Sequence, residues 1–309
     1  MKRRFVYLSD THLRSSRPSC RLDKGYYENQ LEKWREVLQI ASDHADGIIV
    51  HGGDLFHTHN SAISLLVDVC KSHNKFNEVT LYSNVGNHDC DGHVDTVWRS
   101  GLGLLHEYGL LSMPMPFISP VSGAVLKSEP YMISYPEEFY QLPEQMPGVI
   151  KMAMAHDYLT TRWVPFDHRE IKDLKTNADI VLCSHWHSQF IERVGSTLFV
   201  NSGPLDAQKT TERHIKPAVV IVEVDNGKVD ARFHYLKTTG YEEIEVKEEE
   251  EKDLGLADGF VEELQKSNLA DGADIHQAIR VVAKESGYSD SLIERVMKRV
   301  KDSQICVEA

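Results

Sequence analysis

The first part of the chain alternates short apolar runs with segments whose apolar residues recur every three or four positions. Residues 5–8, 47–50 and 79–85 are apolar runs of strand length. Between these runs, apolar residues at helical spacing predict an amphipathic helix over residues 26–44 and a second helix around residues 63–70. This order of strands and helices predicts an α/β fold whose sheet has parallel strands at its centre.

The residue composition of the chain changes after this segment and becomes rich in proline. Seven of the eleven prolines lie between Met113 and Gly148. Because proline interrupts helices and central strands, we expect loops there and two short antiparallel strands, at residues 121–126 and 130–134. Later apolar runs, the last of which follows the tight-turn pair Asn226-Gly227, predict strands at residues 149–155, 179–183, 198–200, 219–224 and 229–236.

The last part of the chain differs in charge. Residues 242–253 include eight acidic residues and two lysines, which is typical of a solvated tether between domains. Apolar residues at helical spacing then predict three short helices, the last of which opens with a capping box from Ser291 to Glu294. The predicted organisation is a large α/β domain over residues 1–240, an acidic linker over residues 241–253, and a small helical cap or partner-binding region over residues 254–309.

Composition indicates a globular protein, with 41% apolar and 26% charged residues. No apolar stretch approaches the ~18 residues that a membrane helix needs, and the apolar run after the basic start is too short for a signal peptide. The five cysteines are widely spaced, which disfavours both a disulfide framework and cysteine metal knuckles. We therefore expect a reducing, cytoplasmic setting.

The formal net charge of −13 argues only weakly against a nucleic-acid partner. Residues 241–309 hold 18 acidic and 9 basic residues, so the main body of the chain is near neutral. Four basic residues crowd one loop near the start of the chain: Arg14, Arg17, Arg21 and Lys24. This loop is either a solvated surface loop or a strip that contacts the phosphates of a nucleic acid.

Five of the predicted strands run directly into polar groups that can bind metal ions. Alone, each group is weak evidence, because Gly-Asp is common in turns and Asp-x-His or His-x-His arises by chance among 16 histidines. Ligands gather outside the carboxyl ends of strands in open α/β sheets, so we expect the five groups to meet at one rim of the sheet. The groups are Asp10-Thr11-His12, Gly53-Asp54, Gly86-Asn87-His88-Asp89, His156-Asp157 and His185-Trp186-His187.

The types of ligand predict the chemistry. Imidazole, carboxylate and amide groups without a thiolate suit Mn, Fe or Zn. The candidate ligands are Asp10, His12, Asp54, Asn87, His156, His185 and His187. Seven are too many for one ion with open positions, but they suit two ions that share a carboxylate and clamp a phosphoryl group. His88, next to a ligand, is then available to protonate the leaving oxygen.

In this motif order, residues 5–235 resemble the calcineurin-like metallophosphoesterase superfamily. The resemblance implies a two-sheet β-sandwich flanked by helices, and it makes His88 the catalytic histidine. Ser184 stands where the superfamily usually has glycine, so this chain keeps a small residue at that position. The two implied metal sites share Asp54, one being completed by Asp10, His12 and His187 and the other by Asn87, His156 and His185.

Within the superfamily, Gly52-Gly53-Asp54-Leu55-Phe56-His57 is similar to the nuclease subunit of SbcCD-type DNA double-strand-break repair complexes. The resemblance implies that His57 assists the nuclease reaction; an ordinary loop histidine is the alternative. It further implies two Mn²⁺ ions (with Fe²⁺ or Zn²⁺ as alternatives), DNA as the substrate, a coiled-coil ATPase partner of the SbcC type and a homodimer formed through helices near residues 61–76 and 95–108. The Asp and Arg that serine/threonine phosphatases carry shortly after Gly-Asp are missing here.

Three functions follow as hypotheses. The leading one is a Mn²⁺-dependent DNA exonuclease or endonuclease that acts in DNA repair and recombination, which makes residues 1–240 a metallophosphoesterase (nuclease) domain. The second is a stand-alone phosphodiesterase on small nucleotides or other phosphodiesters. The third is a DNA-end-binding scaffold with little turnover, which the full set of seven ligands disfavours. Arg162 and Trp163 are further candidates for DNA contact, although a core position is the alternative for Trp163.

Overall fold

A computed structural model describes residues 2–113, 117–132, 135–143, 148–162 and 168–237. The chain divides into two units, Met1–Glu245 and Val246–Ala309, and every described residue belongs to the first. The predicted acidic linker and the predicted C-terminal helices lie outside the described residues, as does Trp163. In the described part of the chain, no helix has the length and apolar character needed to span a lipid bilayer.

The first of two large sheets contains the strands at the start of the chain. It consists of β1 (Arg3–Leu8), β2 (Ile48–His51), β3 (Thr80–Ser83), β12 (Ala218–Asp225) and β13 (Lys228–Tyr235). The order is β13-β12-β1-β2-β3, in which β1, β2 and β3 are parallel and β12 is antiparallel to both of its neighbours. Asn226 and Gly227 both have positive φ angles, of 48° and 74°, as the predicted tight turn between β12 and β13 requires.

The second sheet contains β4 (Phe117–Ile118), β5 (Ala124–Glu129), β6 (Ile150–Ala155), β9 (Ile180–Cys183), β10 (Gln189–Val194) and β11 (Thr197–Ser202). Its order is β10-β11-β9-β6-β5-β4, with parallel pairing from β5 to β11 and antiparallel pairing at both edges. Two short strands, β7 (Leu159–Thr160) and β8 (Arg169–Glu170), pair with each other separately.

The proline-rich segment differs from its prediction. The strand expected at residues 121–126 is β5, which begins at Ala124, is antiparallel to β4 and is parallel to β6. The partner strand expected at residues 130–134 is wrong, because residues 130–132 form a loop. Pro130 follows the last residue of β5 and has no N–H to donate to a sheet. The edge strand β10 is missed by the apolar pattern, since Glu192 and Arg193 interrupt it.

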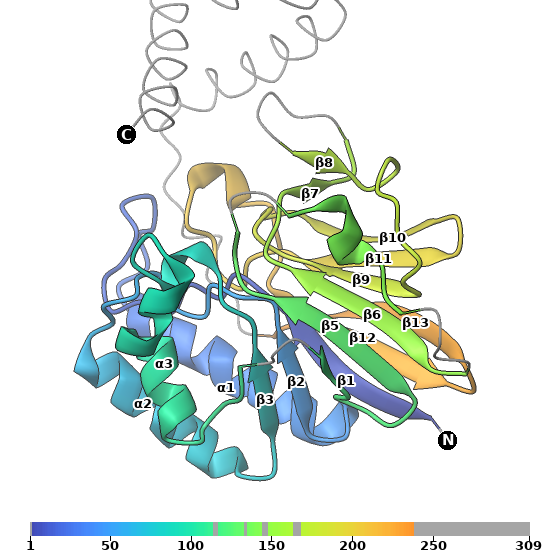
Figure 1. Ribbon diagram of the computed structural model, residues 1–309. Coiled ribbons are helices and arrows are strands. Elements are labelled where there is room, and N and C mark those ends of the chain that lie inside the picture. The colour runs from blue at the N-terminus through green and yellow to red at the C-terminus, as the bar shows by residue number, and fades with distance from the viewer. Residues whose placement is uncertain (1, 114–116, 133–134, 144–147, 163–167, 238–309) are drawn as a thin grey trace, which may run out of the picture. The chain divides into compact units, whose positions relative to one another are not determined.

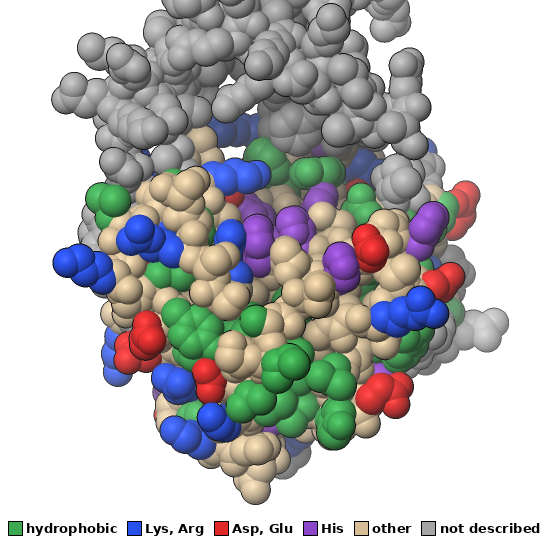
Figure 2. All heavy atoms as spheres, turned by 90° about the vertical axis from the view of Figure 1, so that its left-hand side faces the viewer, with side chains coloured by type: hydrophobic (Ala, Val, Ile, Leu, Met, Phe, Trp, Pro, Cys, Tyr) green, Lys and Arg blue, Asp and Glu red, His purple; other side chains and the backbone are tan. Residues whose placement is uncertain are grey.

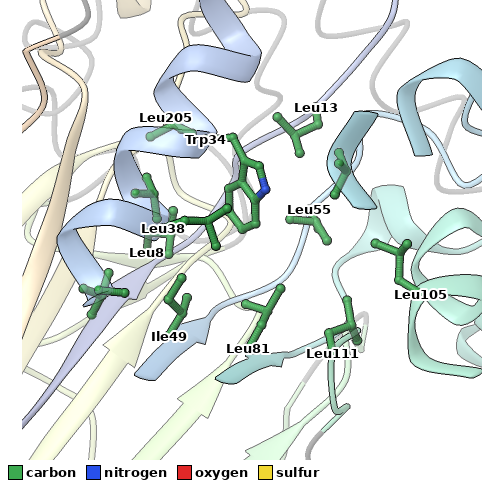
Figure 3. Packing of buried hydrophobic residues seen from close by; sticks show 14 of the residues in the cluster. Leu8, Leu13, Trp34, Leu38, Ile49, Leu55, Leu81, Leu105, Leu111 and Leu205 are labelled. Carbon is green, nitrogen blue, oxygen red and sulfur yellow. The ribbon is translucent and has the colours of Figure 1, made fainter. Parts of the chain in front are cut away.

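The helices cover the outer face of the first sheet (Figure 1). They are α1 (Tyr26–His44), α2 (Ile63–His73) and α3 (Gly101–Glu107). The described residues also form the short 3₁₀ helices η1 (Asn74–Phe76), η2 (Asn87–Asp89), η3 (Val94–Arg99), η4 (Glu137–Tyr140) and η5 (Thr210–Glu212). Of these, η4 packs instead against β6 and β9 of the second sheet. Trp34 and Leu38 of α1 are fully buried against Leu8, Ile49 and Leu81 of the sheet (Figure 3). This apolar face fixes α1 over the parallel strands.

A second apolar core lies between the two sheets. Successive side chains of a strand point to opposite faces, and in β1 this places Phe5 and Tyr7 between the sheets and Val6 and Leu8 under the helices. Met152 of β6 meets the first pair from the other sheet. The predicted α/β class, with a two-sheet sandwich flanked by helices, is confirmed.

Candidate metal centre

The polar groups at the strand ends come from two sheets. Those after β1, β2 and β3 belong to the first sheet, and those after β6 and β9 belong to the second. The expectation of a rim on a single sheet is therefore wrong, and the groups meet where the carboxyl ends of both sets of strands converge at one edge of the sandwich. Histidine side chains gather on one face of the molecule, with Lys and Arg side chains next to them (Figure 2).

The backbone turns sharply at these strand ends. Asp10, His12, Asp54 and His185 have positive φ angles of 52°, 46°, 58° and 69°. Few residues other than glycine adopt this left-handed conformation, and Asp, Asn and His do so more readily than most. Positive φ angles persist where the surrounding structure enforces them, and they concentrate at functional sites.

The first cluster consists of Asp10, His12 and His187. Nε2 of His187 lies 3.1 Å from Nε2 of His12 and 3.6 Å from Oδ1 of Asp10. One possible ligand atom from each residue lies within 4.8 Å of the others. Two imidazole nitrogens and a carboxylate oxygen thus face one point, as the ligands of a cation do.

The second cluster consists of Asp54, His156 and His185. Nε2 of His156 lies 3.2 Å from Oδ2 of Asp54 and 3.1 Å from Nδ1 of His185. The same oxygen of Asp54 lies 3.7 Å from Nε2 of His12, which belongs to the first cluster. The carboxylate of Asp54 therefore faces both clusters.

Asn87 completes the seven predicted ligands. Its Oδ1 is buried and has no hydrogen-bond partner among the described residues. A buried acceptor without a donor costs about 1–3 kcal/mol, and coordination to a cation removes that cost. Oxygen and imidazole donors without thiolate suit divalent cations, so these residues fit a two-metal site. The donor set leaves the identity of the metal open.

Burial opposes charge on the histidines of the centre, but neighbouring carboxylates reverse this effect at two of them. At His187, burial lowers the pKa, and the neighbouring carboxylates of Asp10 and Glu212 outweigh it and raise the pKa to about 10. At His156, burial is likewise outweighed by the charge of Asp54, which raises the pKa to about 9. At His185, burial dominates and lowers the pKa to about 3. His187 and His156 are therefore surrounded by more negative charge than His185.

The pKa values of the two carboxylates, Asp10 and Asp54, are lowered by the histidines around them. Burial raises the pKa of Asp10, but the nearby imidazoles of His187, His156 and His12 bring it below its usual value. The pKa of Asp54 is lowered in the same way, mainly by His156. Both carboxylates are thus ionised at neutral pH, the form in which they bind cations.

Three histidines each have Nδ1 next to an oxygen of the protein. Nδ1 of His156 lies 3.0 Å from the carbonyl oxygen of Gly52, and Nδ1 of His88 lies 2.8 Å from that of His57. Nδ1 of His187 lies 2.7 Å from Oε1 of Glu212. Because carbonyl and carboxylate oxygens accept hydrogen bonds, Nδ1 carries the proton and Nε2 is left for the site.

Two supporting carboxylates were not assigned a role from the sequence. Asp89 is buried, and its Oδ2 accepts hydrogen bonds from the backbone nitrogens of Asp54 (2.7 Å) and Gly86 (2.9 Å), which ties the loops after β2 and β3 together. Its position in the Gly-Asn-His-Asp group was the available signal. Glu212 has no such signal, because it lies 25 residues after His187 and outside any recognised motif.

His57 lies beside this centre. Its ring stacks on that of His88 with the centroids 5.3 Å apart, and it meets the ring of His12 edge-on at 5.6 Å. Burial and the nearby charge of Arg14 lower the pKa of His57 to about 4. His57 is therefore neutral at pH 7, and its ring lies next to that of His88.

The basic loop is partly occupied by internal interactions. Arg21 is buried, and its guanidinium donates to Asp23 at 2.9 Å and contacts Asp206. Arg14 donates to Gln208 at 3.2 Å, and Arg17 donates to a backbone carbonyl oxygen at 2.8 Å. Arg17 and Lys24 are exposed, as is Arg162 elsewhere in the chain. The loop is thus not a continuous strip of solvent-facing cations.

Residues 4–227 match the family profile described as the calcineurin-like phosphoesterase superfamily domain. No curated protein matches the chain. Among solved structures, the chain is similar to an archaeal phosphodiesterase (16% identity, 75% of this chain and 99% of that chain covered, TM-score 0.39). It is also similar to TT1561 of Thermus thermophilus (12% identity, 75% and 99% covered, TM-score 0.44). A putative 5'-nucleotidase from Staphylococcus aureus, in complex with alpha-ketoglutarate, is similar as well (13% identity, 84% and 59% covered, TM-score 0.48).

Proposed function

The chain belongs to the calcineurin-like phosphoesterase superfamily, and on this premise we propose that it is a metal-dependent phosphodiesterase that acts by itself on small phosphodiesters such as nucleotides. Membership of the superfamily and the two histidine-aspartate clusters support the general conclusion that the chain is a metal-dependent phosphoesterase. The diester substrate and its small size are the proposal.

The observation that best supports a two-metal phosphoesterase is the position of Asp54 between the two clusters. Its Oδ2 lies 3.2 Å from Nε2 of His156 and 3.7 Å from Nε2 of His12, so one carboxylate is within reach of both sets of ligands. When bound, two cations supply the positive charge that polarises a phosphoryl group and lowers the pKa of an attacking water. We propose Mn²⁺ as the metal, in keeping with the mixed nitrogen and oxygen donors.

His88 is the proposed general acid. Its Nδ1–H donates to the carbonyl oxygen of His57, so in the imidazolium form Nε2 carries the second proton and can give it to the leaving oxygen. Its backbone N–H donates to Oδ1 of Asp54 at 2.8 Å, so the loop that carries His88 is fixed to the shared carboxylate. This arrangement holds the proton donor next to the ligands without making it a ligand.

The distribution of charge favours a small substrate. A protein that tracks along nucleic acid contacts many phosphates with Lys and Arg. Here Arg21 is buried in ion pairs, and Arg17 is hydrogen-bonded to its own loop. A small diester needs only the metal centre and a neighbouring cation, which Arg14 supplies, since its charge acts on His57 beside the centre.

The test compares substrates with Mn²⁺ present. We expect hydrolysis of bis(p-nitrophenyl) phosphate and of small nucleotide diesters, and no degradation of linear double-stranded DNA. Asp54→Asn should lower kcat/KM for the small diesters by at least about 100-fold, because it removes the charge shared by both cations. Asp46→Asn, at an exposed ion pair with Arg3, is the matched control and should leave activity unchanged. Degradation of DNA without hydrolysis of small diesters would contradict the proposal.

The position of His57 supports a second candidate, the nuclease subunit of an SbcCD-type complex with DNA and a coiled-coil ATPase as partners. Its ring lies against those of both His12 and His88. For this function His57→Asn should reduce DNA degradation while sparing small diesters. DNA-end binding without turnover in the same assay would instead indicate a scaffold.

The second candidate includes a homodimer, for which exposed apolar side chains provide support. Ile63 and Val67 on α2 and Leu104 on α3 are 79%, 43% and 42% exposed. Tyr108, which follows α3, is 78% exposed. Hydrophobic side chains gather on this face (Figure 2). If a dimer forms there, Val67→Glu should produce a monomer in analytical ultracentrifugation, whereas a wild-type monomer would exclude the dimer.

A further inference from the structure

Glu212 lies behind the first cluster, at the end of η5, and is only 5% exposed. Its Oε1 is 2.7 Å from Nδ1 of His187. An ionised carboxylate can only accept a hydrogen bond, so Nδ1 of His187 carries the proton. Nε2 lies on the side of the ring that faces Asp10 and His12, and it can bind a cation there once it has given up its own proton.

The second oxygen of Glu212 holds the carboxylate in place. Oε2 accepts hydrogen bonds from the backbone nitrogens of Gln208 at 2.7 Å and Lys209 at 3.2 Å. Both oxygens therefore have partners, and the side chain cannot rotate away from His187 without losing three hydrogen bonds. The loop between β11 and β12 thus places the negative charge of Glu212 next to the imidazole of His187.

The same loop is anchored by buried cations. Oδ1 of Asp206, which precedes η5, is 2.8 Å from Nζ of Lys33, a fully buried residue of α1. The guanidinium of Arg21 contacts the same oxygen of Asp206 and also pairs with Asp23. Arg21, from the basic loop, thus holds the segment that carries Glu212, a role distinct from contact with phosphate.

We propose that Glu212 is a positioning residue, which fixes the tautomer of His187 and strengthens cation binding by the cluster of Asp10, His12 and His187. The inference rests on the metal centre of the proposed function. The second cluster is supported differently, because Nδ1 of His156 is bonded to the neutral carbonyl oxygen of Gly52. Loss of a hydrogen-bond partner behind a metal ligand typically costs about 10–100-fold in metal affinity, so the loss is expected at one cation only.

The test is a titration of the metal-free full chain with Mn²⁺, monitored by calorimetry. For Glu212→Gln, one of the two cations should bind about 10–100-fold more weakly, and the other should bind as in the wild type. The matched control is Glu223→Gln, because Glu223 also pairs with cations, Lys2 at 2.6 Å and Arg4 at 3.0 Å, but lies on β12 away from the ligands. The control should bind both cations with wild-type affinity.

A second measurement separates positioning from support of the fold. The nitrogen chemical shifts of His187 in the Zn²⁺-loaded protein report which ring nitrogen carries the proton. They should show Nδ1 protonated in the wild type and a changed or mixed state in Glu212→Gln. Unchanged affinity at the other cation shows that the variant is folded.

Three results would overturn the inference, in distinguishable ways. Wild-type affinity at both cations in Glu212→Gln would remove the role of Glu212 and leave the proposed function intact. An equal loss at both cations would show that Glu212 supports the fold in general. A wild-type protein that binds no divalent cation would overturn the metal centre, and with it both proposals.

Discussion

Individual histidines in the metal centre are oriented by acceptors on the far side of their rings. A backbone carbonyl oxygen holds Nδ1 of His156, another holds that of His88, and Glu212 holds that of His187. Such partners set the tautomer and the direction of the ring before a cation binds. At the residue scale, the centre therefore depends on the groups behind the ligands as well as on the ligands.

The role of His88 can be tested by His88→Asn. We expect kcat to fall by about 10²–10⁴-fold, because a general acid contributes that much, while two cations still bind. The loss should be larger for a diester with a poorly acidic leaving group than for bis(p-nitrophenyl) phosphate, whose leaving group needs no proton. Steady-state kinetics with both substrates and metal analysis check this. Loss of a bound cation would instead make His88 a ligand.

His73, at the end of α2, predicts a pH dependence of stability. Burial lowers its pKa below the usual value of about 6.5, although a backbone hydrogen bond at Val79 and the charge of Glu78 oppose the shift. The unfolded chain therefore takes up a proton more readily than the folded chain. The stability contributed by neutral His73 is present above pH 6.5 and is lost as the pH falls from there toward the folded pKa.

His73→Gln should reduce that loss. Between pH 7.5 and pH 5.5, the free energy of unfolding should fall less in the variant than in the wild type, by up to about 1.4 kcal/mol per pH unit within the affected range. Urea unfolding at several pH values measures the difference. The other histidines contribute equally to both proteins, so identical pH profiles would show that His73 does not titrate as proposed.

At the scale of elements, the strand ends bring chain segments unusually close together. A Cβ atom on Gly86, before η2, would collide with the carboxylate and the backbone nitrogen of Asp54. One on Gly52 would lie 2.7 Å from the hydroxyl oxygen of Tyr7 and 2.8 Å from Cβ of Ser9. The loops after β1, β2 and β3 thus pack against each other without room for side chains at these positions.

Gly86→Ala should therefore displace Asp54 and weaken both cation sites, since that carboxylate faces both clusters. We expect at least about a 100-fold loss of kcat/KM, comparable to removal of a charge that stabilises the transition state. Gly25→Ala is the matched control, because the nearest atom to its Cβ would be Oδ1 of Asn29 at 3.9 Å. Calorimetric titration with Mn²⁺ and diester kinetics measure both variants. Wild-type behaviour of Gly86→Ala would mean that the loops can separate.

At the scale of the molecule, the metal centre joins the two sheets. The first sheet supplies the ligands that follow β1, β2 and β3, and the second supplies those that follow β6 and β9. The core between the sheets sets their spacing, with Tyr7 on one side and Met152 on the other. The hydroxyl of Tyr7 also donates to the carbonyl oxygen of Cys183 at 2.5 Å. Cys183 is the last residue of β9, directly before the loop that carries His185 and His187.

All seven candidate ligands lie in the unit Met1–Glu245. A variant that ends at residue 245 should therefore bind two cations and hydrolyse small diesters at a rate comparable to that of the full chain, because it keeps every candidate ligand and His88. Metal analysis and kinetics on the purified variant, next to the full chain, check this. Loss of activity with metal binding retained would show that residues 246–309 contribute to the reaction.

Much of this arrangement was predictable, and the failures have physical causes. The apolar runs in β1, β2 and β9 are buried on both faces, so continuous hydrophobicity indicated them correctly. The edge strand β10 carries Glu192 and Arg193, and the pairing of β5 depends on β6, more than twenty residues away. Charged residues in an edge strand and pairing between distant strands do not produce a hydrophobic period in the local sequence, so the sequence pattern could not predict them.

The sequence by itself determined the chemical types of the donors and their places after apolar strands, because side-chain chemistry and hydrophobic period are properties of local sequence. Resemblance to a known superfamily implied two sheets and a shared Asp54, whereas only the tertiary structure decided which strands belong to each sheet and that Glu212 lies behind His187. It also decided that Arg21 is buried against Asp206. These relations join residues far apart in the chain, and they depend on which surfaces pack together.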